Sequence, residues 1–185
     1  MSQWIIIGIV AAVVLFAIFA YNQLVEARQM VREGWSGIDV QLKKRANLIP
    51  NLVAAVKGYM KHERELLEKI TELRARAGAM EKASPRERSA VEQEISTLLG
   101  RILVAVENYP DLKANQNVLD LQRQLSEIEN DIQMARRYYN GAVRENNILV
   151  ASFPSNLIAM LFGFRQAEYF ELENPADRAV PQVQL

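Results

Sequence analysis

An uninterrupted apolar run near the N-terminus constrains the fold of this chain more than any other feature. The run extends from Trp4 to Tyr21 and contains neither a charged residue nor a proline. As a helix it is roughly 27 Å long, close to the hydrocarbon thickness of a bilayer. Aromatic rings at its two ends suit the headgroup layers. The run predicts a transmembrane anchor within residues 1–25, with Trp4 and Tyr21 at the two membrane interfaces.

Two other structures contain apolar runs of this kind, a cleaved signal peptide and a buried core helix. A signal peptide is disfavoured because no Lys or Arg precedes the run, because the run is long, and because no small-x-small cleavage site follows it. A core helix is disfavoured because an apolar surface on all sides is unusual in a small domain. A retained anchor is the favoured interpretation.

The distribution of basic residues predicts the orientation of the anchor. Only residues 1–3 precede it, and none of them is basic. The positive-inside rule counts Lys and Arg rather than net charge, so it predicts an external N-terminus and a cytoplasmic C-terminal part. The residues that follow the anchor include Arg28, Arg32, Lys43, Lys44 and Arg45, interspersed with Glu26, Glu33 and Asp39.

The composition disfavours an enzyme. Cysteine is absent and His62 is the only histidine, which excludes disulfides, thiolate ligands, the usual catalytic triads and multi-histidine metal sites. The 8 glycines form no phosphate-binding cluster. Because 22 basic residues balance 22 acidic ones, no strong field attracts nucleic acid. We expect no catalytic residue, cofactor, metal, nucleic acid or small-molecule substrate.

Beyond the anchor, apolar residues recur at alternating spacings of three and four, which is typical of a coiled-coil-like helix. Arg45 and Glu63 occupy two positions of the same series. The series keeps its phase through Pro50, so we expect a kink there rather than a helix end. One helix from the anchor to Ala77 would be on the order of 110 Å long. The apolar members are Val31, Trp35, Ile38, Leu42, Ile49, Leu52, Val56, Tyr59, Leu66, Ile70, Leu73 and Ala77.

Two further long helices are predicted. Gly78 and a polar connector end the first helix, and residues 84–87 (Ser-Pro-Arg-Glu) combine an N-cap serine, a proline at the first helical position and a capping-box glutamate. After a turn at residues 108–110, a third apolar series extends from Val118 to Leu149. Phe153-Pro154 interrupts it, and a short apolar segment, residues 157–164, follows.

Short connectors make neighbouring helices antiparallel, and no period-two alternation predicts a strand. The expected fold is therefore all-α: a transmembrane helix that continues into an antiparallel up-down bundle of three long helices, followed by a short C-terminal helix. We expect the bundle to occupy residues 26–164 and residues 165–185 to form a loose tail.

Three polar patterns are interpreted as structural. His62-Glu63 lacks the second histidine of a zinc helix, because Leu66 stands where that histidine would be. The cation–aromatic string 136–140 contains a residue of the apolar series, Tyr139, and has acidic neighbours. Acidic pairs spaced two apart face different sides of a helix, so they are expected to be solvated. These pairs are Glu92 with Glu94 and Glu127 with Glu129.

Two sets of residues are candidates for an interface. Arg45 and Glu63 are either buried with partners that fix register or oligomeric state, or exposed by the kink and by a frayed surface. The apolar segment 153–164 is too short to span a bilayer, so it either caps the bundle, lies in the headgroup layer or docks on another subunit. Its candidate contact residues are Leu157, Leu161, Phe162 and Phe164.

Several strings together carry a family resemblance. They are YNQLV (21–25), VREGWSGIDVQLKKRANLIPNLVAAVKGYMKHE (31–63), ENYPDLKANQN (107–117), LQRQLSEIEN (121–130), RRYYNGAVRENN (136–147) and FPSNLIA (153–159). With them the chain strongly resembles the bacterial LemA family, from the anchor to about residue 170. The resemblance implies a cytoplasmic helical bundle behind an anchor of the bacterial inner membrane, and no established catalytic activity.

The expected function is that of a membrane-anchored scaffold, not an enzyme, that self-associates into a homo-oligomer and organises or shapes the bilayer. The resemblance implies a relative in magnetosome membrane formation, which favours membrane organisation. It also implies frequent gene proximity to a membrane zinc peptidase. The alternative is therefore an adaptor that presents its bundle to another membrane protein such as a protease. The expected partners are membrane lipid and further copies of the chain, or a membrane protein.

Overall fold

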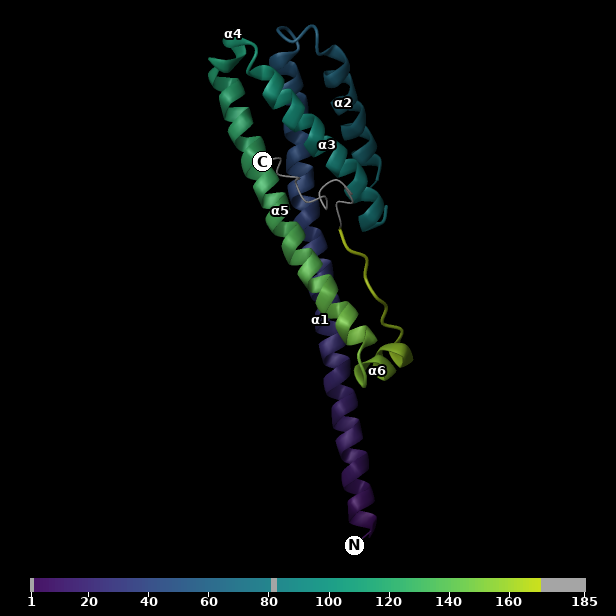
Figure 1. The fold of residues 1–185 in the computed structure, drawn as a ribbon. Coiled ribbons are helices and arrows are strands. Elements are labelled where there is room, and N and C mark those ends of the chain that lie inside the picture. Colours follow the sequence, from purple (N-terminus) through teal and green to yellow (C-terminus); the bar gives the residue numbers. More distant parts are fainter. Residues whose placement is uncertain (1, 81–82, 171–185) are drawn as a thin grey trace, which may run out of the picture. The chain divides into compact units, whose positions relative to one another are not determined.

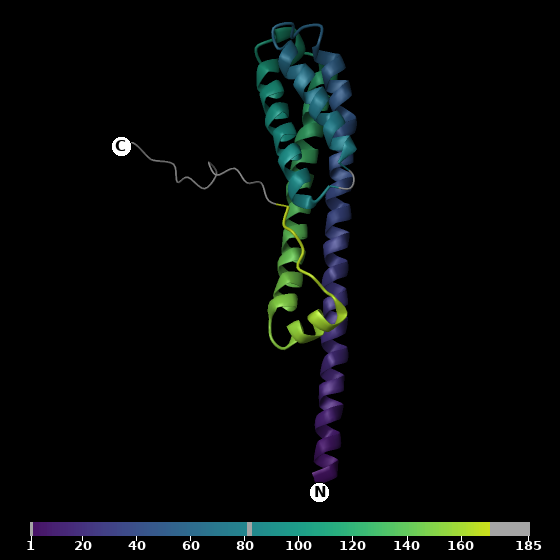
Figure 2. The same cartoon turned by 90° about the vertical axis from the view of Figure 1, so that its right-hand side faces the viewer.

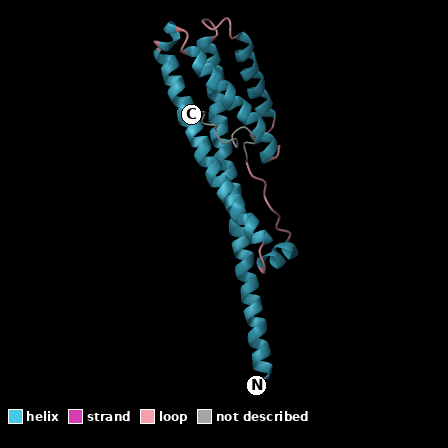
Figure 3. Cartoon of the chain, in the orientation of Figure 1, coloured by secondary structure: helices cyan, strands magenta, loops and turns pink. Residues whose placement is uncertain are grey.

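The computed structural model describes residues 2–80 and 83–170, and within them the regular structure is entirely helical (Figures 1 and 3). This confirms the predicted all-α fold with a long N-terminal apolar helix and a short C-terminal helix. The helices are α1 (Ser2–Val56), α2 (Arg64–Ala79), α3 (Pro85–Val106), α4 (Pro110–Lys113), α5 (Gln116–Ala151) and α6 (Ser155–Phe162).

The chain divides into two compact units. Unit 1 comprises Met1–Gln41 and Asn130–Tyr169, and unit 2 comprises Leu42–Glu129 and Phe170–Leu185. Helices α1 and α5 each contribute to both units. The predicted tail beyond residue 170 lies outside the described residues.

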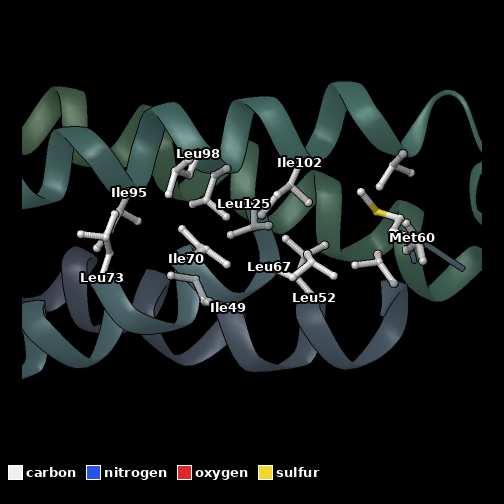
Figure 4. Close-up of a cluster of buried hydrophobic side chains, with 14 of the residues drawn as sticks. Ile49, Leu52, Met60, Leu67, Ile70, Leu73, Ile95, Leu98, Ile102 and Leu125 are labelled. Carbon is white, nitrogen blue, oxygen red and sulfur yellow. The ribbon is translucent and has the colours of Figure 1, made fainter. Parts of the chain in front are cut away.

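Unit 2 is a bundle built around one apolar core (Figure 4). The C-terminal part of α1, the helices α2 and α3, and the N-terminal part of α5 all supply buried side chains. The apolar series predicted Ile49, Leu52, Ile70 and Leu73 among the core residues, because one face of each helix must be removed from water, but it did not predict Met60 or Leu67. The core residues labelled in Figure 4 are Ile49, Leu52, Met60, Leu67, Ile70, Leu73, Ile95, Leu98, Ile102 and Leu125.

The expectation of one helix from the anchor to Ala77 is wrong. Helix α1 continues through Pro50 but ends at Val56, and α2 begins at Arg64. After this break Met60 is buried and Tyr59 is 48% exposed, the reverse of the predicted series. Gly58 lies within the break, and a glycine there disfavours continuation of the helix by about 1 kcal/mol relative to alanine. The break makes a separate helix of α2, whose apolar face packs against α3 in the unit 2 core.

The start of α3 confirms the predicted capping box. The Ser84 hydroxyl accepts a hydrogen bond from the Glu87 backbone N–H, and the Glu87 carboxylate accepts one from the Ser84 N–H at 2.9 Å. These hydrogen bonds to Ser84 hold the pKa of the Glu87 carboxyl below its usual range. The other predicted interruptions also occur, because α4 begins at Pro110 and α5 ends before Phe153.

In unit 1, α1 and α5 approach each other closely. A Cβ added at Gly34 would lie 3.0 Å from the Tyr139 Cα and 3.2 Å from Cδ1 of Tyr138. The Trp35 and Tyr139 rings pack beside this contact, with centroids 5.5 Å apart. Space rather than backbone conformation therefore favours glycine at Gly34, because a larger residue would need α5 to move by a few tenths of an ångström.

Candidate functional site

The N-terminal part of α1 is exposed on all sides. Only 6% of its most apolar eighteen-residue window is buried, whereas a soluble core helix would be mostly covered. Trp4 is 78% exposed, and the large apolar side chains from Ile5 to Phe19 are between 39% and 68% exposed. Among the described residues this is the one helix long and apolar enough to cross a membrane. These properties indicate a single-pass membrane anchor.

Arg45 lies inside unit 2, where it joins α1 to α3 and α5. Its side chain is 1% exposed, and its guanidinium donates to the carboxylates of Glu92 at 2.5 Å and Glu129 at 2.6 Å. It also donates to the Glu92 backbone carbonyl at 3.1 Å and to the Ser96 hydroxyl at 2.5 Å. Ser96 in turn donates to Glu129 at 3.0 Å. Arg45 is therefore a buried residue that is paired within its own chain.

The acidic partners of Arg45 correct a second expectation. Glu92 is buried and Glu129 is partly buried, so neither belongs to a solvated face as the sequence suggested. Arg88 lies 3.8 Å from Glu92 and is also buried. Charges taken out of water need partners, and this cluster provides them within the bundle. The cluster therefore stabilises the packing of α1, α3 and α5.

Glu63 also has an intramolecular partner. It lies just before α2, where its carboxylate accepts a hydrogen bond from the Tyr109 hydroxyl, just before α4. This hydrogen bond to Glu63 raises the pKa of Tyr109 above its ordinary value. The contact joins two interhelical connectors of unit 2. Glu63 therefore holds these two connectors together within the chain.

Helix α6 has a covered face and an exposed face. Ala159 and the following Phe164 are buried against Leu24 of α1, beside which α6 lies in Figure 2. Gly163, at φ 70°, ends α6 in the left-handed conformation that favours glycine and turns Phe164 inward. The exposed residues of α6 are Leu157 at 52%, Met160 at 75%, Leu161 at 74% and Phe162 at 56%, and Phe153, just before the helix, is 80% exposed. The candidates Leu157, Leu161 and Phe162 thus remain accessible, whereas Phe164 does not.

The aromatic residues of α6 meet the C-terminal end of the apolar run. The Tyr21 ring packs edge-on against Phe162 with centroids 4.8 Å apart, and against Phe164 at 5.7 Å. The Arg28 guanidinium lies 4.7 Å from the Phe164 ring centroid. Tyr21, predicted as an interface anchor, is therefore also the residue that docks α6.

The segment after α6 is held by α5, although the sequence suggested a loose tail from residue 165. Asn147 accepts from the Ala167 N–H at 2.8 Å and donates to the Ala167 carbonyl at 3.0 Å. Asn146 donates to the Arg165 carbonyl at 3.2 Å, and the Tyr139 hydroxyl donates to the Glu168 carbonyl at 2.7 Å. Sequence reasoning missed this function of the two asparagines. Adjacent amides at the end of an apolar series were the available signal.

Tyr139 gives unit 1 a testable pH dependence. Burial and the neighbouring Glu168 carboxylate raise the pKa of Tyr139 to about 12, from an ordinary value near 10. The unfolded chain loses this proton first, so the stability from the protonated hydroxyl is complete below pH 10 and falls as the pH rises toward 12. We expect Tyr139→Phe to flatten this loss. Denaturant titrations of both proteins at several alkaline pH values check it, and parallel curves would contradict it.

Among residues 2–80 and 83–170, no group of three or more His, Asp or Glu side chains is placed to hold a metal ion. The fold and these contacts define a class of protein: a helical bundle attached to one N-terminal apolar helix suited to membrane anchoring. A model of the LemA family matches residues 34–185. The chain therefore belongs to the LemA family, as its sequence strings suggested.

Curated relatives are similar over most of the chain. Magnetosome protein MamQ 2 of Paramagnetospirillum magneticum is 25% identical over 95% of this chain and 74% of its own length. Protein LemA of Metamycoplasma hominis is 26% identical over 81% of this chain and 68% of its own. Magnetosome protein MamQ of Magnetospirillum gryphiswaldense is 23% identical over 88% of this chain and 70% of its own.

Proposed function

We propose that this protein is a non-enzymatic scaffold of the bacterial inner membrane that self-associates into a homo-oligomer and so organises or shapes the bilayer. One observation carries the proposal. The part of α5 in unit 1 bears a stripe of exposed apolar side chains, Met134, Tyr138 and Ile148, which are between 51% and 57% exposed. Exposed Glu145 interrupts the stripe, and the Tyr138 ring also reaches toward Gly34 of α1. Gly141 lies on the same side, and nothing lies within 4 Å of a Cβ added there.

A second copy of the chain fits this stripe. Residues spaced by about three, four or seven positions fall on one side of a helix, which is the pattern of a helix–helix seam. The stripe belongs to the same unit as the anchor, and anchors in one bilayer share an orientation. Copies therefore present the stripe in parallel, and a formal net charge of zero does not oppose their association. The similarity to magnetosome proteins supports a role in membrane organisation.

The mass of the full-length protein, extracted gently from its own membrane, tests the scaffold. We expect a large, uniform homo-oligomer by native electrophoresis or electron microscopy. The double variant Met134→Arg/Ile148→Arg places charges in the stripe and is expected to shrink the particle. Val104→Arg, a matched control on α3 at a side chain that is 65% exposed, is expected to leave its mass unchanged. A small wild-type particle would sink the scaffold proposal.

The proposed orientation places the N-terminus outside, the anchor in the membrane and the chain after the anchor in the cytoplasm. Its support is the basic residues after the anchor, of which Arg28, Arg32 and Lys44 are exposed. The chain has no cysteine, so a Lys44→Cys variant carries a single reactive thiol. We expect a membrane-impermeant thiol reagent to leave it unlabelled in intact spheroplasts. Labelling of the Lys44→Cys variant in intact spheroplasts, before lysis, would indicate the opposite orientation.

An adaptor for another membrane protein is the second candidate. A surface cavity of about 620 Å³ between the end of α1 and α2 favours it. Val53, Met60 and Leu67 supply apolar lining, and Lys57 and Lys61 supply positive charge. Such a groove fits an acidic segment with apolar anchors. A stoichiometric foreign polypeptide, recovered with the wild type from native membranes and lost in Lys57→Glu/Lys61→Glu, would favour this candidate over the scaffold.

A further inference from the structure

The exposed side of α6 is an apolar feature that the scaffold leaves unexplained. Residues Ser155–Phe162 include no charged side chain. The inner side of α6 is already used, because Ala159 packs with Leu24 in a small core. The outer residues Met160 and Leu161 are each about three-quarters exposed. One side of α6 is docked and the other is apolar and exposed. An exposed apolar side of this kind indicates a contact with lipid or with another protein.

The position of α6 in unit 1 identifies this environment. Phe162 contacts Tyr21, which is the last residue of the apolar run of α1. The exposed surface of α6 therefore continues the exposed apolar surface of the anchor. Tyrosine at the end of a spanning helix lies at the level of the headgroups. Aromatic contact with Tyr21 places the C-terminal end of α6 at the same level.

The surroundings of α6 fit the same level. Arg28, one turn or more beyond the anchor, lies over Phe164, and Arg165 follows α6 on the exposed surface. Cations at this height suit lipid phosphates. Exposed carboxylates are also present, at Glu26 and Glu168, so the attraction to lipid comes mainly from the apolar side chains rather than from net charge.

We propose that α6 is an interfacial helix, which lies in the cytoplasmic headgroup layer beside the anchor and inserts Leu157, Met160 and Leu161 among the lipids. The helix is too short to span the bilayer, and its docked inner side keeps it from leaving the anchor. Each copy would then occupy more area in one leaflet than in the other. This inference rests on the membrane anchor of the proposed function, and adds a second lipid contact that the anchor alone does not require.

Fluorescent probes on the cysteine-free full-length chain test the proposal. Leu161→Cys, labelled with an environment-sensitive dye, reports on α6 in vesicles of phosphatidylcholine and phosphatidylglycerol. Leu15→Cys in the anchor is the lipid-exposed reference, and Val104→Cys on α3 is the water-exposed reference. All three side chains are between 65% and 74% exposed, so labelling should not disturb packing. Each site is quenched separately by aqueous iodide and by a spin label on the lipid acyl chain.

We expect iodide to quench the dye at Leu161 about fivefold less than the dye at Val104, and the lipid spin label to quench it clearly. Equal iodide quenching at these two sites would overturn the proposal. Protection from both quenchers at Leu161 would also overturn it, because a second copy or another part of the chain would then cover α6. If the lipid spin label quenches the dye at Leu15 but not the dye at Leu161, only the interfacial position of α6 is rejected. If the lipid spin label quenches neither dye, the membrane anchor itself is rejected.

Discussion

Replacing Arg45 with methionine is expected to lower the free energy of unfolding of the bundle by about 3–5 kcal/mol. The replacement retains much of the side-chain volume but removes the cation to which Glu92 and Glu129 are paired. Glu92 would then be a buried carboxylate that has lost its closest cation, and Arg88 lies farther away, at 3.8 Å. An uncompensated buried charge is among the most destabilising changes that one substitution can make.

Urea denaturation followed by circular dichroism measures this effect in detergent-solubilised protein. Lys44→Met is the matched control, because Lys44 precedes Arg45 on α1 but is exposed, and it should change stability by less than about 0.5 kcal/mol. Adding Arg88→Met, Glu92→Leu and Glu129→Leu to Arg45→Met should restore most of the loss, since this replaces the whole buried ion cluster by apolar side chains, a change that is often neutral. If Arg45→Met and Lys44→Met behaved alike, the buried network would not stabilise the bundle.

The Arg45 network shows what the sequence could predict and what it could not. The apolar series placed Arg45 on a buried side of its helix, and elementary electrostatics required a partner there. The partners stand 47 and 84 residues away, on helices whose rotation is set by their own packing. Local spacing assigned both glutamates to solvent because it cannot report which side of a distant helix faces Arg45. Burial was predictable, but pairing was not.

The break between α1 and α2 was missed for a related reason. The alternating spacing continues in phase from Val56 to Ile70, so the sequence pattern reports an apolar side without reporting where the helix ends. The energy that favours the break comes from packing α2 against α3, a contact between segments that only the fold brings together. By contrast, the start of α3 was predicted because a capping box is a local interaction.

The contacts of α6 were partly predictable from the sequence. Its apolar composition predicted a contact, and three alternatives were open: capping, lipid and subunit. Ala159 and Phe164 show that capping accounts for one side only. Periodicity cannot separate the two sides of a helix that is apolar all round. In the fold, hydrogen bonds from Asn146 and Asn147 hold the chain after α6 and so determine which side of α6 packs against α1.

Gly34 and Gly37 on α1 are expected to respond to alanine in opposite directions. A Cβ at Gly34 would meet the α5 backbone at Tyr139 within 3.0 Å, whereas a Cβ at Gly37 meets nothing within 4 Å. Alanine raises helix propensity by about 1 kcal/mol at either site. At Gly37 that gain should appear as increased stability. At Gly34 overpacking should exceed it, and Gly34→Leu should cost about 3 kcal/mol because backbone cannot move aside as a flexible side chain can.

Thermal unfolding of the three variants and the wild type separates propensity from packing, because the two glycines share a helix and differ in their neighbours. The expected order of midpoints is Gly37→Ala above wild type, then Gly34→Ala, then Gly34→Leu. The Trp35 and Tyr139 rings pack beside Gly34, so near-ultraviolet circular dichroism should change in the Gly34 variants and not in Gly37→Ala. If Gly34→Ala stabilised the protein as much as Gly37→Ala, α1 and α5 would be free to separate, and the close approach would not specify unit 1.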